Sequence, residues 1–289
     1  MEIKRERALQ LIAELWADDY RLTRQYFGKY LSQLLVALIE GEKFDEHFVN
    51  CTFEPDNLEK RLRKIEYLGQ TKSIVAEVGD ISDPDILDKR LSNVWAEIRV
   101  IDQLLREGFS DIQKVRETSD FIAQLQGQNY AIQVVRINSS LESKAAKNQT
   151  YSDISPYGSI SSIHSRLDSI VSEYFWNALD VKNGKFKSWK KENYVRCIII
   201  VSSDENLQDS MVRHIACQQI RNNIHLLMNR YFEELVWLPD LSDGAWFKVG
   251  STLDETRCLV NWKDELGQDS EKDDKVIRHQ VDLDSLIGL

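Results

Sequence analysis

The sequence predicts an α/β protein with a mixed sheet, and three observations support that fold class. A long helical pattern over residues 83–108 precedes three short strand-like segments that are separated by turn residues. Residues 194–202 are almost continuously apolar, which is typical of a strand covered on both faces. The elements are expected in the order α-β-β-β-α-β-α-β, which is an α/β core.

The first 82 residues are predicted to form a helical amino-terminal unit. Residues 4–39 carry apolar side chains at spacings of three and four, the pattern of amphipathic helix. A charged helix is expected over residues 57–67, and residues 73–78 fit either a strand or a helix. This unit would precede a core at residues 83–241.

The helix over residues 83–108 has the clearest start and stop signals in the chain. Asp83 is a capping side chain, and Pro84 follows it in the first turn. Gly108 ends the helical pattern. Glu97 lies three and four residues from apolar positions, so it is expected on the flank of the buried stripe and not on the solvent face.

Three strand-like segments with turn residues between them are predicted to form an antiparallel meander, at residues 112–116, 120–125 and 130–137. The remaining core elements are expected to be a helix over 160–178, a strand over 194–202, a helix over 207–228 and a strand over 234–238. Residues 242–289 are predicted to be a small extension that contains strands and an acidic loop.

Composition and charge restrict the classes of partner. The chain has 289 residues, of which 42% are hydrophobic and 29% charged, as in a globular protein. Its formal net charge of −10 argues against attraction of nucleic acid to the whole surface, so a nucleic-acid site would have to be local. The best basic cluster, in which aromatic residues alternate with lysines, contains Lys182, Lys185, Lys187, Lys190 and Lys191. A solvated loop would carry the same residues.

Neither export nor membrane insertion is expected. The amino terminus has no apolar run of signal-peptide type, and no stretch approaches the roughly 20 apolar residues of a membrane helix. The four cysteines are scattered and never form a CxxC pair, so a zinc site or a disulfide framework is not indicated. We therefore expect a cytoplasmic protein with reduced thiols.

The order of helix, meander, helix and strand over residues 83–240 resembles the core of the PD-(D/E)XK nuclease superfamily, which includes many restriction endonucleases. The resemblance implies a restriction-endonuclease-like mixed sheet. It also implies a site built from Glu97 on the first helix, Asp120 at the start of the second strand and Gln133 in the third strand. Val135 occupies the position at which that superfamily has a lysine.

In that superfamily the acidic groups hold Mg²⁺, with Mn²⁺ as a substitute, and the resemblance assigns this role to Asp120, Gln133 and Glu97. The metal activates a water molecule and stabilises the charge on the phosphate, while the lysine orients the water. Arg136 cannot replace the lysine, because neighbouring strand residues point to opposite faces. We therefore expect a lysine from elsewhere, with Lys144 or Lys147 nearest in sequence.

Each of these residues also has an ordinary structural explanation. Asp120 fits a turn, Glu97 fits a helix-edge carboxylate paired with a nearby basic residue, and Gln133 fits a hydrogen bond across the sheet. The leading hypothesis is a metal-dependent DNA endonuclease, a homodimer in a host-defence or mobile-element setting. The alternative is a catalytically inactive nuclease-like scaffold that binds a protein partner or nucleic acid in a larger complex. A ligand-binding domain with a phosphate loop near 202–206 is the weakest hypothesis.

Overall fold

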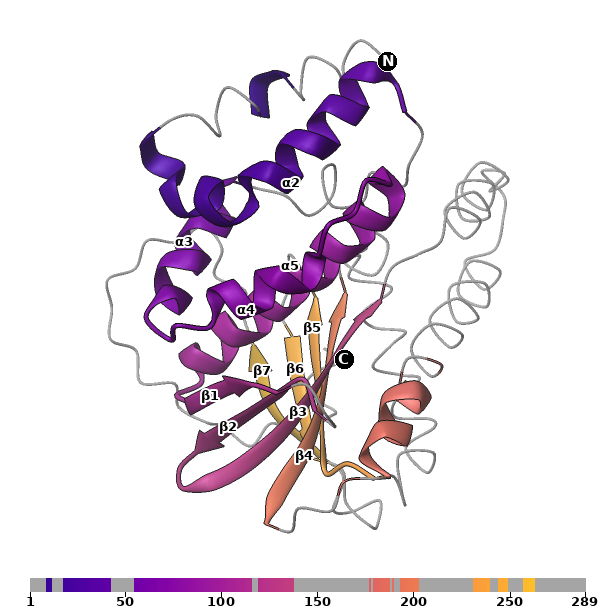
Figure 1. Cartoon of the computed structure of the whole chain (residues 1–289). Helices are drawn as coiled ribbons and strands as arrows, with labels where there is room; N and C mark the ends of the chain where they lie inside the picture. The colour runs from indigo at the N-terminus through magenta and orange to yellow at the C-terminus, as the bar shows by residue number, and fades with distance from the viewer. Residues whose placement is uncertain are drawn as a thin grey trace, which may run out of the picture. The chain divides into compact units, whose positions relative to one another are not determined.

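A computed structural model describes residues 9–11, 18–42, 55–115, 119–137, 177, 179–187, 189, 193–202, 231–239, 244–248 and 257–262. The chain divides into two compact units, Met1–Lys114 and Val115–Leu289 (Figure 1). Helices and a mixed sheet are both present, which confirms the α/β class. The predicted domain limits at residues 82 and 241 stay predictions.

The first unit is mainly helical. Its described elements are η1 (Asp18–Tyr20), α2 (Arg21–Glu40), α3 (Pro55–Glu66), α4 (Thr71–Val75), η3 (Ala76–Val78), α5 (Pro84–Arg106) and the strand β1 (Ser110–Lys114). It thus includes α5 and β1, which were predicted as parts of the core. Helices α2, α3 and α5 pack against one another in pairs, and leucines such as Leu35, Leu62 and Leu91 are fully buried between them. Residues 73–78, for which the sequence left two alternatives, are helical.

Helix α5 forms as its sequence signals predict. The Asp83 side chain accepts hydrogen bonds from the backbone N–H groups of Asp85, at 2.9 Å, and Ile86, at 3.1 Å, and Pro84 occupies the first turn. These bonds satisfy donors that the helix itself leaves open. Gly108 follows the helix with φ +82°, a left-handed conformation in which a side chain would be strained.

At the outer edge of β1, a side chain takes the place of a further strand. The Gln70 amide oxygen accepts the N–H of Lys114 at 2.6 Å, and its amide nitrogen donates to the carbonyl of Ile112. One carboxamide therefore supplies the donor and the acceptor that a neighbouring strand would otherwise provide. This contact holds the Lys114 end of β1 beside α4 within the first unit.

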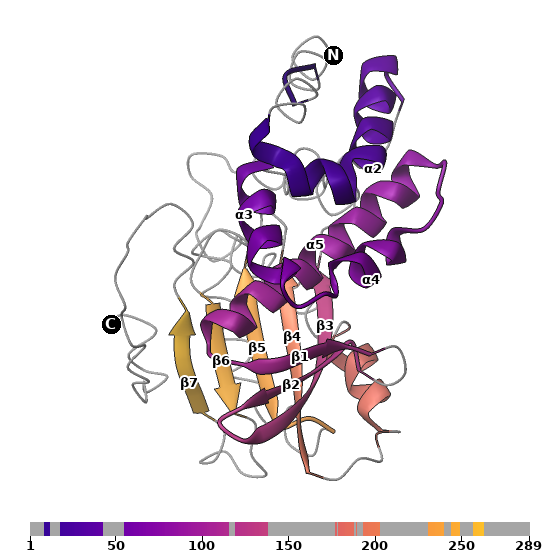
Figure 2. The same ribbon diagram turned by 60° about the vertical axis from the view of Figure 1, so that its left-hand side comes forward.

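The second unit is built on a mixed sheet whose strands neighbour one another in chain order: β2 (Phe121–Leu125), β3 (Gln128–Ile137), β4 (Tyr194–Ser202), β5 (Glu234–Pro239), β6 (Gly244–Lys248) and β7 (Arg257–Trp262). Strands β3, β4 and β5 are parallel, whereas the β2–β3, β5–β6 and β6–β7 pairs are antiparallel. Figure 2 shows β3 to β7 side by side. The carboxyl-terminal strands thus continue the sheet of the core.

The hairpin between β2 and β3 sets the position of everything that follows on β3. Gln126 and Gly127 both have positive φ angles, 51° and 80°, as a two-residue turn with the twist of a hairpin requires. The register that results pairs Phe121 with Ile132. On the other edge of β3, Gln133 lies opposite Ile198 of β4, and both of these residues are buried. The start of β2 is therefore placed beside the middle of β3.

Within the described segments, no helix has the length and apolar character that crossing a membrane requires. The helix predicted over residues 207–228, and most of the one predicted over 160–178, lie outside the described residues.

Candidate active site

Asp120 is held at the start of β2 by two hydrogen bonds to β3. Its backbone N–H donates to the carbonyl of Ile132 at 2.9 Å, and its side-chain oxygen Oδ2 accepts the backbone N–H of Val134 at 2.7 Å. These two bonds lie on either side of Gln133 in the sequence of β3. The sheet therefore places Asp120 beside Gln133, two of the residues that the resemblance groups in one site.

The structure adds a lysine to this pair. Residues 179–186 are helical, and Lys182 on this helix places its ammonium nitrogen Nζ 3.0 Å from Oδ2 of Asp120. The two side chains are 17% and 22% exposed, so the ion pair is partly shielded from water but can still be reached. Lys182 lies 62 residues from Asp120 along the chain. The helix that carries it is the one beside β4 in Figure 1.

The environment of Lys182 disfavours its charged form. Burial is the largest influence on the pKa of Lys182 and lowers it, and the neighbouring charge of Lys185 lowers it further. Asp120 acts in the opposite direction, because a carboxylate stabilises the ammonium. The net result is a pKa below the ordinary lysine value. A lysine with a lowered pKa beside a carboxylate, in a partly exposed position, is the kind of group found at functional sites.

The oxygen atoms around Asp120 define what the site could hold. The hydrogen bonds from Val134 and Lys182 both end on Oδ2, and Oδ1 of Asp120 receives no hydrogen bond from the described residues. Gln133 adds an amide oxygen on a side chain that is 1% exposed. Carboxylate and amide oxygens suit Mg²⁺, which keeps several water molecules and often uses only one or two protein carboxylates. The donor chemistry thus fits a magnesium ion.

The protein ligands would nevertheless be few. Among the residues that the structure describes, no group of three or more His, Cys, Asp or Glu side chains could hold a metal ion together. A metal at Asp120 would therefore rely on water and on oxygens of the substrate for most of its coordination.

Glu97, the third predicted ligand, has its described contact within the first unit. Its carboxylate oxygen Oε1 lies 2.6 Å from Nζ of Lys114, and Lys114 also contacts Glu77 at 3.2 Å. Burial is the largest influence on the Lys114 pKa and lowers it, but the combined charges and hydrogen bonds of Glu97 and Glu77 leave that pKa raised. The observed contact is the helix-edge ion pair that the sequence offered as the structural alternative for Glu97.

The predicted basic residues are only partly described. Lys185 and Lys187 are exposed near the end of the helix, where they could meet a polyanion. Lys182 is instead turned to Asp120. The two lysines named as replacements for the missing one, Lys144 and Lys147, lie outside the described residues, as do Lys190 and Lys191.

The sequence predicts Lys182 as part of a nucleic-acid-binding cluster and carries no local signal that connects it with Asp120. No spacing rule links a helix residue to a strand start 62 positions away. The one available signal was that a helix between parallel strands β3 and β4 must pack along the sheet, which brings some of its side chains to the strand ends.

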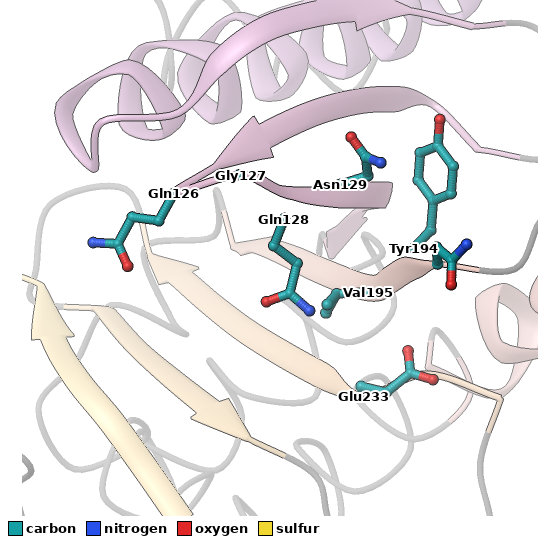
Figure 3. A pocket seen from close by; sticks show the side chains of 8 residues that line it. Gln126, Gly127, Gln128, Asn129, Tyr194, Val195 and Glu233 are labelled. Carbon is teal, nitrogen blue, oxygen red and sulfur yellow. The ribbon is translucent and has the colours of Figure 1, made fainter.

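A pocket lies at the other end of β3, away from Asp120. It has a volume of about 620 Å³ and is formed by the β2–β3 turn, the start of β4 and the residue before β5. Figure 3 shows the residues that line it and labels all of them except Asn193. The full lining is Gln126, Gly127, Gln128, Asn129, Asn193, Tyr194, Val195 and Glu233.

Comparison of the chain with protein-family models, with curated proteins and with solved structures finds no match.

Proposed function

We propose that the second unit is a metal-dependent phosphodiesterase of the PD-(D/E)XK type that cleaves DNA. The observation that carries the proposal is the contact between Lys182 and Asp120. A lysine is the one group that the motif on β3 lacks, because Val135 stands in its position. The helix after β3 supplies an ammonium to the same carboxylate, at 3.0 Å.

Oxygen atoms of Asp120 and Gln133 are the groups that would hold Mg²⁺ or Mn²⁺. When bound, the ion supplies a hard positive charge that lowers the pKa of water and stabilises the phosphate as it is attacked. The hydrogen bond from the Val134 N–H holds Oδ2 of Asp120 in place, and Oδ1 would be the oxygen that contacts the ion. Glu97 is engaged by Lys114, so the proposal assigns it no ligand role.

Lys182 orients the attacking water in this proposal. Its ammonium donates to Asp120, so a water molecule beside that carboxylate lies within reach of the same donor. Because its pKa is lowered, Lys182 gives up a proton at a lower pH than an ordinary lysine. It can therefore take part in proton transfer to or from that water more readily than a lysine in solvent.

DNA binding would be local on a chain of this charge. The exposed Lys185 and Lys187 follow Lys182 on the same segment, so positive charge continues outward from the Asp120 site. Phosphate groups interact with such lysines without reading the sequence. This arrangement supports a polyanionic substrate despite the formal net charge of −10.

The test is cleavage of plasmid DNA and of linear single- and double-stranded DNA, with Mg²⁺, with Mn²⁺ and with EDTA. The full chain is compared with Asp120→Asn and Lys182→Met, and with Lys60→Met as a matched change of an exposed lysine in the first unit. We expect metal-dependent cleavage that both site variants reduce at least a hundredfold, as losses of catalytic groups do, and that Lys60→Met leaves unchanged. Cleavage that persists in Asp120→Asn would refute the proposal.

A catalytically inactive scaffold is the second candidate, and one observation favours it. The Lys182 ammonium neutralises Asp120 directly, as in a structural ion pair, and the described residues contain no larger acidic cluster. In that case the folded protein cuts no nucleic acid with either metal, and Asp120→Asn changes only its stability.

A further inference from the structure

The pocket at the amino-terminal ends of β3 and β4 is lined mainly by neutral polar groups. Four of its side chains are carboxamides: Gln126, Gln128, Asn129 and Asn193. A carboxamide offers a donor and an acceptor side by side, which complements the edge of a heterocyclic base. The volume of about 620 Å³ lies within the usual range for small-molecule sites.

The acidic residue of the pocket is already neutralised. Glu233 accepts hydrogen bonds from the backbone N–H of Arg196 at 2.7 Å and from its side-chain Nε at 2.9 Å. These contacts and the nearby guanidinium charge balance the carboxylate. The pocket therefore presents amides and no uncompensated negative charge, so it does not repel a nucleic acid.

Two pocket side chains are held in position before any ligand arrives. The amide nitrogen of Gln124 donates to Oδ1 of Asn129 at 3.0 Å, so the Asn129 amide nitrogen is the group available to donate to a ligand. In Figure 3, Asn129 and Tyr194 extend in the same direction from neighbouring strands, as their register requires. Together they offer a hydrogen-bond donor beside an aromatic ring.

Tyr194 also connects the pocket with the basic helix. Its ring lies 5.6 Å from the ring of Trp189, at an interplanar angle of 74°, and Trp189 lies 6.4 Å from Phe186 of the helix. Trp189 follows the exposed Lys187 by two residues. These ring contacts link Tyr194 of the pocket, through Trp189, to the helix that carries Lys185 and Lys182.

We propose that this pocket binds an unpaired base of a single-stranded nucleic acid whose backbone follows the lysine-bearing helix toward Asp120. The inference deepens the proposed function, on which it rests, by naming the strand state of the substrate. Gln128 and Gln133 are five strand residues apart, or about 17 Å, so the bound base and the cleaved phosphate would be separated by several nucleotides. A base inside a duplex cannot enter the pocket, because its hydrogen-bonding edge is paired with the opposite base and its faces are stacked on neighbouring bases.

The test measures binding in EDTA, so that cleavage is not needed for the readout. Fluorescence anisotropy is followed with labelled single strands of oligo-dA, oligo-dC and oligo-dT, and with a duplex of equal length. The variants are Asn129→Ala, which removes the donor, and Tyr194→Leu, which removes the ring. Gln113→Ala changes an exposed glutamine of the first unit, outside the pocket, and is the matched control.

We expect the wild-type chain to bind single strands more tightly than the duplex and to distinguish among the bases. Each pocket variant should weaken single-strand binding about tenfold, the usual loss for one stacked or hydrogen-bonded base. Equal binding of duplex and single strands, or unchanged binding by a folded Asn129→Ala chain, would overturn the inference.

The two proposals fail in different experiments. If Asp120→Asn still binds single strands with base preference but no form of the protein cuts them, the pocket stands and the nuclease does not. If wild type cuts DNA in an Asp120-dependent way while Asn129→Ala and Tyr194→Leu bind normally, the nuclease stands and the base pocket does not.

Discussion

Lys182 and Asp120 lie 62 residues apart in the sequence, and their charged groups meet at 3.0 Å. A second lysine–aspartate pair, Lys29 with Asp80, is even shorter at 2.5 Å but lies on the surface of the first unit. Both pairs are close enough to form an ion pair, so what distinguishes them is burial. The Lys182 and Asp120 side chains are 17% and 22% exposed, whereas those of Lys29 and Asp80 are 70% and 89% exposed.

The difference in burial predicts a difference in energetic coupling. In a double-mutant cycle on the free energy of unfolding, Lys182→Met and Asp120→Asn should show a coupling of about 1 kcal/mol, because a shielded pair is screened less. The same cycle on Lys29 and Asp80 should give no measurable coupling. Urea unfolding of the four chains of each cycle provides the measurement. Equal coupling in the two pairs would show that burial does not set the strength of the Asp120 contact.

Lys182 and Lys114 should titrate on opposite sides of the ordinary lysine pKa. Burial and Lys185 lower the pKa of Lys182, while Glu97 and Glu77 together raise that of Lys114 against the effect of burial. Lysine side-chain NMR across the alkaline range would measure both midpoints. Glu97→Gln should move the midpoint of Lys114 downward and leave that of Lys182 in place.

These shifts also set how stability depends on pH. The raised pKa of Lys114 contributes stability that is fully present below the ordinary lysine value and is lost as pH rises through the folded-state pKa. For Lys182 the sign is reversed: between its lowered folded pKa and the ordinary value the unfolded chain binds more protons, so stability rises with pH. Replacement of either lysine by methionine should remove its own contribution. An unchanged alkaline profile in Lys114→Met would contradict this account.

The parts of the fold that the sequence predicted are those with local signals. Asp83, Pro84 and Gly108 determine the ends of α5, and the Gln126–Gly127 turn determines the register that brings Asp120 to Gln133. Such signals act over a few residues, so they can be recognised in the sequence. The β2–β3 hairpin and the buried strand β4 were predicted for the same reason.

The contacts that the sequence could not reveal join side chains from distant segments. Lys182 reaches Asp120 only because its helix packs along the sheet, and Glu97 meets Lys114 only once β1 is in place beside α4. The contact of Gln70 with the edge of β1 likewise has no corresponding periodic pattern in the sequence. The candidate site was therefore predictable as far as the strands determine it, and the lysine was not.

Glu59 of α3 caps the amino-terminal end of α2, where the N-cap residue makes no side-chain hydrogen bond. Tyr20, which precedes α2, makes no side-chain capping bond. Glu59 on α3 instead accepts the backbone N–H groups of Leu22, at 3.3 Å, and Thr23, at 2.8 Å. Glu59→Ala should lower the free energy of unfolding by about 2 kcal/mol, because it leaves buried donors without a partner.

Hydrogen exchange of the first turn of α2 in the full chain would report this loss directly. Glu66→Ala is the control. Glu66 lies on the same helix as Glu59, and its ion pair with the largely exposed Arg21 is long, at 4.0 Å. This control should leave exchange in α2 nearly unchanged. Equal effects of the two variants would show that Glu59 contributes no more than a surface charge.

Asp102 is a carboxylate of the first unit that contacts three basic side chains. It is fully buried on α5 and forms an ion pair with Arg61, with further contacts to Lys64 at 3.1 Å and Arg106 at 3.2 Å. Arg61 is itself buried and lies over the ring of Trp95, 5.7 Å from its centroid. Removing the carboxylate would leave a buried guanidinium without its counter-charge.

Asp102→Asn should therefore lower the free energy of unfolding by about 3–5 kcal/mol, the usual cost of breaking a buried pair from one side. Arg61→Met should cost less, because Lys64 and Arg106 still compensate Asp102. The double change Arg61→Met with Asp102→Leu should be more stable than Asp102→Asn alone, since it removes both buried charges of this pair. Urea unfolding, with hydrogen exchange in α3 and α5 to assign the loss to the first unit, would measure this order. If Arg61→Met proved the more damaging change, packing of Arg61 on Trp95 and not charge balance would be its main contribution.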